Sequence, residues 1–145
     1  MLVTQLYDEI YRVLSLDIVL MDLMGLTKAD KVKKAKHIQK RRQPQDLISN
    51  LPLITFYSPG GSMDKKNDLV FNAVFAFDTY TTDDVELAQD ISTRICDIFA
   101  KQLMPFKGIE NFESLFIDQS ESITDLANTY CFTTVMLFSI STDKE

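Results

Sequence analysis

Apolar residues change their spacing several times along the chain, and each spacing predicts a different kind of element. In residues 2–14 they recur every three or four positions, which is the pattern of an amphipathic helix with one buried face. Residues 17–24 predict a short second helix, with Ser15 or Asp17 as its N-cap and Gly25 as its C-terminal stop. The chain is therefore expected to begin with two helices that share one apolar side.

Two strands are expected next, because the apolar residues then follow a period of two. Residues 53–57 are rich in β-branched and aromatic side chains and run into residues 58–61 (SPGG), which predicts a strand followed by a turn. Residues 69–80 alternate between two faces. The expected core face consists of Phe71, Ala73, Phe75 and Phe77. The opposite face is only partly polar, so we expect it to be covered as well.

The period changes from two to about 3.6 within residues 81–84 (TTDD), where a strand passes directly into a helix. This helix is expected to begin at Thr82, with Thr81 or Thr82 as its cap, and to stop near Pro105. Its first turn carries three acids, Asp83, Asp84 and Glu86. Carboxylates could bind a metal there, but the positive end of the helix dipole also favours them, and we interpret them as structural.

Two further strands, at residues 113–120 and 130–141, complete the order helix (with a second short helix), strand, strand, helix, strand, strand. Neighbouring strands at this spacing predict antiparallel pairing. The expected fold class is α+β, with an antiparallel sheet of about four strands and the helices packed against it. A chain of 145 residues, 46% of them hydrophobic, is long enough to bury a core as a single domain spanning residues 1–145.

Residues that could carry catalysis or bind a cofactor are sparse. His37 is the only histidine and has no partner nucleophile in the sequence, so we interpret it as a surface residue. Residues 58–66 contain glycines and lysines but lack the GK[ST] ending of a phosphate-binding loop. Cys96 and Cys131 stand alone, which predicts two reduced cysteines and neither a zinc site nor a redox motif. We expect no enzyme activity, no cofactor and no metal.

The apolar stretches at residues 16–26 and 130–140 are interrupted by polar residues and are shorter than the roughly 20 residues that cross a bilayer. The N-terminus also lacks the basic start of a signal peptide, and Asp8 and Glu9 interrupt the apolar stretch that a signal peptide would need. We therefore expect no membrane partner and a protein that stays in the cytoplasm where it is made.

Charge is distributed very unevenly along the chain. Its net charge is −6, but residues 28–42 hold eight basic residues against one acid, Asp30, which gives +7. The basic residues are Lys28, Lys31, Lys33, Lys34, Lys36, Lys40, Arg41 and Arg42. We expect residues 28–45 to form a flexible, solvated segment, partly helical or extended. Three roles stay open for it: a solvated or partner-facing loop, contact with an acidic face of another copy, or binding to nucleic acid.

Several segments together resemble the bacteriophage tail terminator and tail-to-head joining proteins. They are an N-terminal helix running into "SLDIVLMDLMG", the strand "LPLITFY", the strand "LVFNAVFAF" passing into "DDVELAQDISTRICDIF", and the last strand "YCFTTVMLFSIS". The resemblance covers most of the chain, and the Lys-rich residues 28–42 depart from the family pattern.

This resemblance implies a non-enzymatic virion protein, made in the host cytoplasm, that forms a ring at the head-proximal end of the tail. Such a ring, usually a hexamer, caps the tail tube protein, offers a docking surface to the head-tail connector protein, and would leave a passage for DNA. The eight basic residues are the expected partner or subunit interface. The alternative is a small nucleic-acid-binding or regulatory module that uses residues 28–42.

Overall fold

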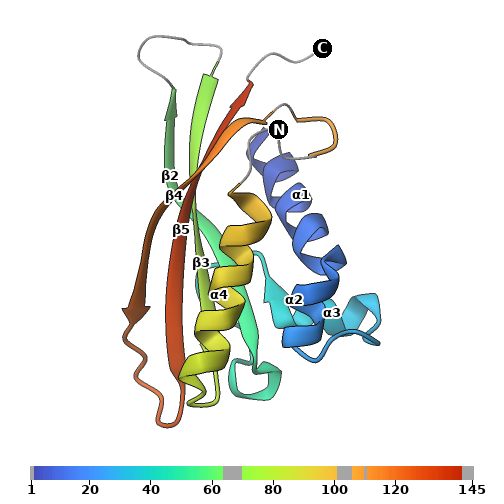
Figure 1. The fold of residues 1–145 in the computed structure, drawn as a ribbon, viewed down its shortest axis with the longest axis vertical. Helices are drawn as coiled ribbons and strands as arrows, with labels where there is room; N and C mark the ends of the chain where they lie inside the picture. Colours follow the sequence, from blue (N-terminus) through green and yellow to red (C-terminus); the bar gives the residue numbers. More distant parts are fainter. Residues whose placement is uncertain (1, 64–69, 101–105, 110, 142–145) are drawn as a thin grey trace.

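The computed structural model describes residues 2–63, 70–100, 106–109 and 111–141 as one sheet with helices on one of its faces (Figure 1). The helices are α1 (Leu2–Leu16), α2 (Ile18–Leu23), α3 (Lys31–His37) and α4 (Val85–Phe99), with a 3-10 turn at Ile48–Asn50. The strands are β1 (Ile38–Gln39), β2 (Leu53–Met63), β3 (Val70–Thr81), β4 (Asn111–Ser122) and β5 (Tyr130–Ser141). None of the described helices is both long enough and apolar enough to span a membrane.

The sheet has the strand order β1-β2-β3-β5-β4. The predicted α+β class is confirmed. The pairs β2–β3, β3–β5 and β4–β5 are antiparallel, as expected. The sheet nevertheless has five strands and is mixed, because β1 adds to β2 in parallel through Ile38 and Gln39. This fifth strand comes from the basic segment, whose two-residue strand is too short to produce a period in the sequence.

The predicted turn at residues 58–61 is wrong. β2 continues through these residues to Met63, and its register against β3 shifts between Tyr57 and Gly60. A bulge at this point accommodates Pro59, which has no amide hydrogen for the ladder. The Ser58 amide instead donates to the Tyr7 hydroxyl of α1 at 2.8 Å, which ties the bulge to the helical layer.

Aspartate caps both α2, which follows α1, and α4, which follows β3. Asp17 caps α2 by accepting from the Leu20 amide, and Gly25, with φ +70°, follows this helix as predicted. The cap of α4 is Asp84, which accepts from the Leu87 amide at 3.0 Å; neither Thr81 nor Thr82 is the cap. The Thr81 hydroxyl donates to the Asp84 carbonyl instead. Helix α4 ends at Phe99, before the expected stop near Pro105, which lies outside the described residues.

The core lies between the sheet and the helices α1 and α4. Phe75 and Phe77 of β3 are fully buried and Ala73 is nearly so, as the alternation predicts, while Phe71 is only half-buried at the edge of the core. Phe99 of α4 stacks on Phe77 at 5.6 Å and meets Phe138 of β5 edge-on at 5.5 Å. Aromatic pairs of this kind add to the burial energy of their rings.

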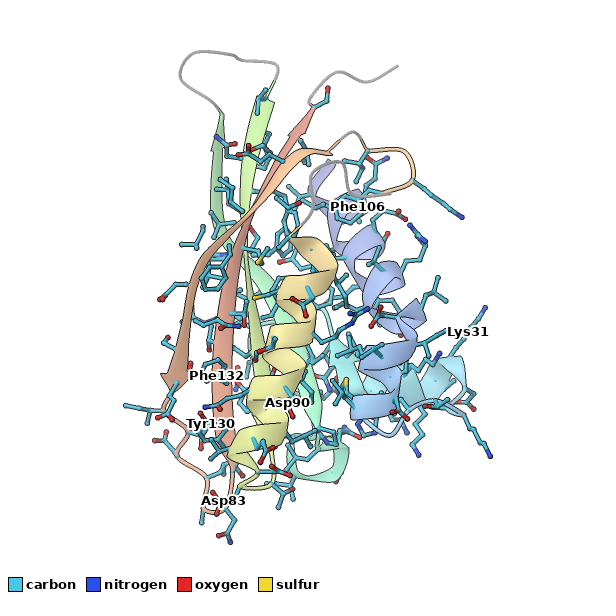
Figure 2. All side chains as sticks on the ribbon, viewed as in Figure 1. Lys31, Asp83, Asp90, Phe106, Tyr130 and Phe132 are labelled. Atoms are coloured by element: carbon cyan, nitrogen blue, oxygen red, sulfur yellow. The ribbon has the colours of Figure 1, made fainter. Side chains whose placement is uncertain are left out.

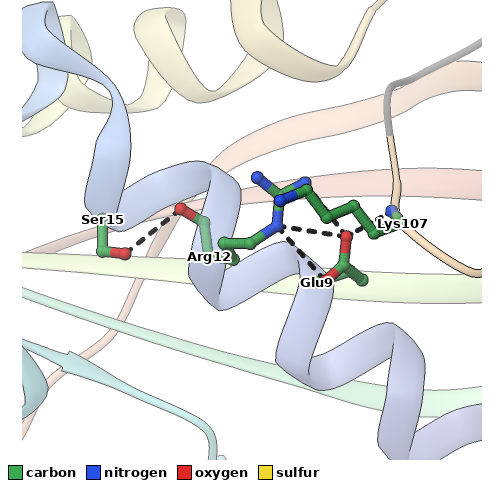
Figure 3. A network of polar contacts seen from close by, with 4 residues as sticks. All are labelled: Glu9, Arg12, Ser15 and Lys107. Atoms are coloured by element: carbon green, nitrogen blue, oxygen red, sulfur yellow. Dashed lines mark hydrogen bonds and ion pairs between the residues drawn. The ribbon is translucent and has the colours of Figure 1, made fainter.

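A small polar network holds residues 106–109 to α1 (Figure 3). Arg12 donates to Glu9 from one turn later, with Nη2 3.0 Å from Oε1, and the Lys107 amide donates to the same Glu9 oxygen at 2.5 Å. Partial burial opposes ionisation of Glu9, but the hydrogen bonds from Arg12 and from the Lys107 amide hold its pKa below the ordinary value.

Candidate interaction surfaces

The basic segment lies at the β1 edge of the sheet. Asp30 caps α3 by accepting from the Lys33 amide at 2.8 Å, and the helix passes directly into β1 at Ile38. Because β1 pairs with the buried strand β2, the residues around α3 are placed by the fold of the sheet. The eight predicted basic residues therefore gather along one edge of the molecule.

Four of the eight cations make intramolecular contacts. Lys34 Nζ donates to the Ser15 carbonyl at 3.2 Å, and Lys40 pairs with Asp8 while lying 5.3 Å from the Tyr11 ring centre. These two lysines attach the basic segment to α1.

The two arginines contact the sheet and the following loop. Arg41 donates to Gln45 at 3.3 Å, and Arg42 lies 5.5 Å from the centre of the Tyr57 ring. A guanidinium at this distance from an aromatic face gains a cation–π attraction. Arg41 and Arg42 therefore have structural contacts within the chain.

The other four cations are exposed, and no hydrogen bond or ion pair of their side chains occurs within the described part of the chain. They are Lys28, Lys31, Lys33 and Lys36. Lys31 points away from the body of the molecule (Figure 2). Lys28, Lys33 and Lys36 line a shallow hollow of about 680 Å³ beside α3. These four residues are the part of the predicted site that is free to meet a partner.

His37 has a structural environment. It is half-buried, and its Nδ1 donates to the Pro52 carbonyl at 2.9 Å. The contact fixes the end of α3 against the residue before β2. The prediction of a surface histidine is thus corrected to a packed one.

Apolar residues are exposed beside the basic segment, in a region we call the helical corner. It consists of Leu16, Ile18, Val19 and Val32, exposed by 64%, 79%, 49% and 67%, together with Lys31 and Lys33, which flank Val32. The Lys34 contact with Ser15 holds α3 against the end of α1, immediately before Leu16. Val32 lies two residues before Lys34 and lines the hollow with Lys33 and Lys36, so it faces another side of α3 than the Lys34 contact. Exposed apolar residues on neighbouring elements are often found at protein-protein contacts.

A second apolar region lies at the opposite edge of the sheet, on the edge strand β4, and we call it the β4 surface. It consists of Leu115, Phe116 and Ile117, each close to half-exposed, with the acids Asp118 and Glu121. The pairing with β5 places Phe116 and Glu121 on the helix-bearing face and Leu115 and Asp118 on the other, so this surface wraps around the free edge of the strand. A long edge strand leaves one row of backbone groups without a strand partner, and exposed apolar side chains favour pairing with another chain. The sequence does contain a signal for this surface, since Leu115-Phe116-Ile117 breaks the alternation of a strand with one buried face.

The helix-free face of the sheet holds a polar cluster around Asp78. Thr133 donates to Asp78 at 2.6 Å, and the Tyr57 hydroxyl also hydrogen-bonds to it. Burial raises the pKa of Asp78 above its ordinary value, and these hydrogen bonds and Arg42 oppose the rise. The hydroxyl of Thr55, whose strand position is paired with that of Asp78, is the one buried side-chain polar atom without a hydrogen bond among the described residues.

The thiols of both cysteines are protonated at neutral pH. Burial raises the pKa of Cys131 to about 12, with a smaller effect from Asp78, and burial also raises the pKa of Cys96. A thiolate is the reactive form of cysteine. Neither thiol therefore has the environment of a nucleophile.

Two of the predicted acids, Asp84 and Glu86, have structural positions at the start of α4. Asp84 accepts from the Leu87 amide, and Glu86 lies in the first turn. Within the described residues, no group of three or more His, Cys, Asp or Glu side chains is placed to hold a metal ion.

No family model matches the chain, and no curated protein sequence does. Among solved structures, 26 chains match. One belongs to a structure described as "Virion of native gene transfer agent (GTA) particle". The two chains are 15% identical, the alignment covers 94% of each, and the TM-score is 0.66. At this identity the likeness establishes a shared fold over nearly the whole of both chains.

Proposed function

We propose that this chain is a non-enzymatic structural protein of a phage-like virion. The main support for this proposal is the fold shared with a chain of a gene transfer agent virion, which extends over 94% of both chains. The fold alone does not assign a role. The surfaces add to the argument, because the helical corner and the β4 surface offer two separate apolar contacts rimmed by charge.

Within such a particle, the proposed role is that of a tail terminator. The chain would form a homo-oligomeric ring, a hexamer, at the head-proximal end of the tail, where it caps the tail tube protein and receives the head-tail connector protein. The resemblance of the element order to tail terminator and joining proteins supports this role. The chain would be made in the host cytoplasm and would reside in the virion.

The experiment is a tube-assembly assay with the tail tube protein of the particle to which this chain is proposed to belong. Tube subunits are polymerised with increasing amounts of the protein, and tube lengths are measured by negative-stain electron microscopy. A terminator shortens the tubes in proportion to its concentration and appears as density at one tube end only. Unchanged tube lengths at a several-fold molar excess of the protein would contradict the proposed role.

A second candidate is nucleic-acid binding through the basic segment. It rests on the four exposed cations whose side chains make no hydrogen bond or ion pair with the residues that the structure describes. Contacts of lysine with phosphate predict retention on DNA that falls steeply as salt rises. Replacing Lys28, Lys31, Lys33 and Lys36 by Gln should abolish that retention. Equal retention of the unaltered and substituted proteins, or none by either, would remove this candidate.

A further inference from the structure

The helical corner and the β4 surface lie at opposite edges of one sheet. The helical corner is attached to the β1 edge, since α3 passes directly into β1, and β4 is the strand at the other end of the order. Figure 1 shows α3 and β4 on opposite sides of the molecule. Neither surface can therefore contact the other within one copy.

The two surfaces are complementary in charge. Residues 31–37 of α3 carry four lysines and no acid, and the twelve residues of β4 carry three acids and no basic residue. Lys31 and Lys33 flank exposed Val32 on one side, and Asp118 follows exposed Ile117 on the other. Each surface thus presents apolar side chains beside charges of one sign, opposite to the sign of the other.

We propose that the β4 surface of one copy receives the helical corner of the next copy. Val32 packs on Phe116 and Ile117 at the free edge of β4, while Lys31 and Lys33, on either side of Val32, meet the acids on the two faces of that edge, Asp118 and Glu121. The contact is heterologous, so each copy uses a different surface toward each of its two neighbours, and repetition closes a ring or extends a filament. This inference rests on the proposed ring and names its interface.

The opposite charges also determine the direction of assembly. Two β4 surfaces repel each other through their acids, and two helical corners repel each other through their lysines. An isologous dimer through either surface is therefore disfavoured, and a head-to-tail order is favoured. Apolar contact supplies affinity, and charge selects the partner surface.

The test uses two charge-reversal variants of the full chain. In the first, Lys31→Glu and Lys33→Glu make the helical corner acidic; in the second, Asp118→Lys and Glu121→Lys make the β4 surface basic. Each variant alone has two surfaces of like sign. A mixture of both restores every contact in an alternating ring with an even number of copies. All four residues are exposed, so the thermal melt of the first variant should match that of the unaltered protein. The second should melt only slightly lower, because Glu121→Lys removes the hydrogen bond from the Tyr130 hydroxyl.

Sedimentation velocity over a concentration series measures the association. Each variant alone should associate at least tenfold more weakly than the unaltered protein, and an equimolar mixture should regain its assembly. Asp90→Lys on α4 is the matched control, since Asp90 is an exposed acid outside both surfaces (Figure 2). Assembly of the Asp90→Lys protein should be unchanged.

Oxidative cross-linking gives a second readout of the same contact. A protein with Val32→Cys is mixed with a protein with Phe116→Cys, and a disulfide-linked pair of copies should form in the mixture and not in either protein alone. Normal assembly of both charge-reversed proteins, without this cross-link, would overturn the interface and leave the ring standing. A monomer in every case, with no cross-link, would contradict the ring and the interface together.

Discussion

Asp17 and Arg94 join two helices that are far apart in the sequence. Arg94 Nη2 lies 2.7 Å from Asp17 Oδ1 and its Nε lies 2.9 Å from Oδ2, while Oδ2 also accepts from the Leu20 amide. One carboxylate thus caps α2 and holds α2 against α4. Because Ile18 and Val19 of α2 belong to the helical corner, this pair places part of a surface that the proposed ring uses.

Asp17→Ala should therefore destabilise the protein more than Asp17→Asn. Alanine removes the cap and the ion pair, which we expect to lower the free energy of unfolding by about 2 kcal/mol. Asparagine keeps an oxygen for the cap and loses only the charge, with an expected loss of about 1 kcal/mol. Urea unfolding of the three proteins measures the difference. Equal stability of the two variants would show that the cap contributes nothing.

Asp84 should be the residue that stabilises the start of α4. Asp84→Ala removes the acceptor of the Leu87 amide and should lower the free energy of unfolding by about 1 kcal/mol. Thr82→Ala is the control, since Thr82 is exposed and is not the cap. Thermal melts distinguish the two positions. A larger loss for Thr82→Ala than for Asp84→Ala would contradict the assignment of the cap.

The raised pKa of Asp78 predicts a pH-dependent stability. A carboxyl whose pKa is higher in the folded chain favours folding when protonated, so its ionised form costs stability at pH 7, and this cost disappears as the pH falls toward the unfolded-state pKa near 4. Asp78→Asn should therefore raise the melting temperature at pH 7 and have less effect at pH 4. The oxygen of asparagine can still accept from Thr133. If the increase in melting temperature caused by Asp78→Asn became larger as the pH fell, the raised pKa of Asp78 would be contradicted.

Two phenylalanines should behave in opposite ways. Phe99 is fully buried against Phe77 and Phe138, so Phe99→Ala should cost about 3 to 5 kcal/mol of stability. Phe116 is 50% exposed, so Phe116→Ala should change stability by no more than about 0.5 kcal/mol and weaken only the assembly. Denaturant unfolding and sedimentation, measured on the same samples, separate the two effects. Normal assembly of the Phe116→Ala protein would argue against the β4 surface as a contact.

Elements with one buried face were predictable from the sequence. The alternation around Phe75 gives β3, and the spacing around Ile91 gives α4, because burial against the core imposes a period on both. The extension of β2 through Pro59 was not predictable, since a bulge depends on pairing with β3. The strand β1 was missed for the same reason, because its position comes from its partner strand.

The candidate site was only half predictable. The basic residues are evident in the sequence, but which of them are free depends on contacts such as that of Lys34 with Ser15, which joins segments 19 positions apart. The β4 surface was missed, although the run of Leu115, Phe116 and Ile117 signalled it. A surface that serves another copy is not shaped by the chain's own core and leaves a weaker pattern.

The ring itself is most directly tested by native mass spectrometry of the purified protein over a concentration series, alone and with the tail tube protein. A heterologous contact that closes predicts one discrete oligomer, of six copies, that grows at the expense of the monomer as concentration rises. A protein that stays monomeric at every concentration, including with the tail tube protein present, would contradict the account.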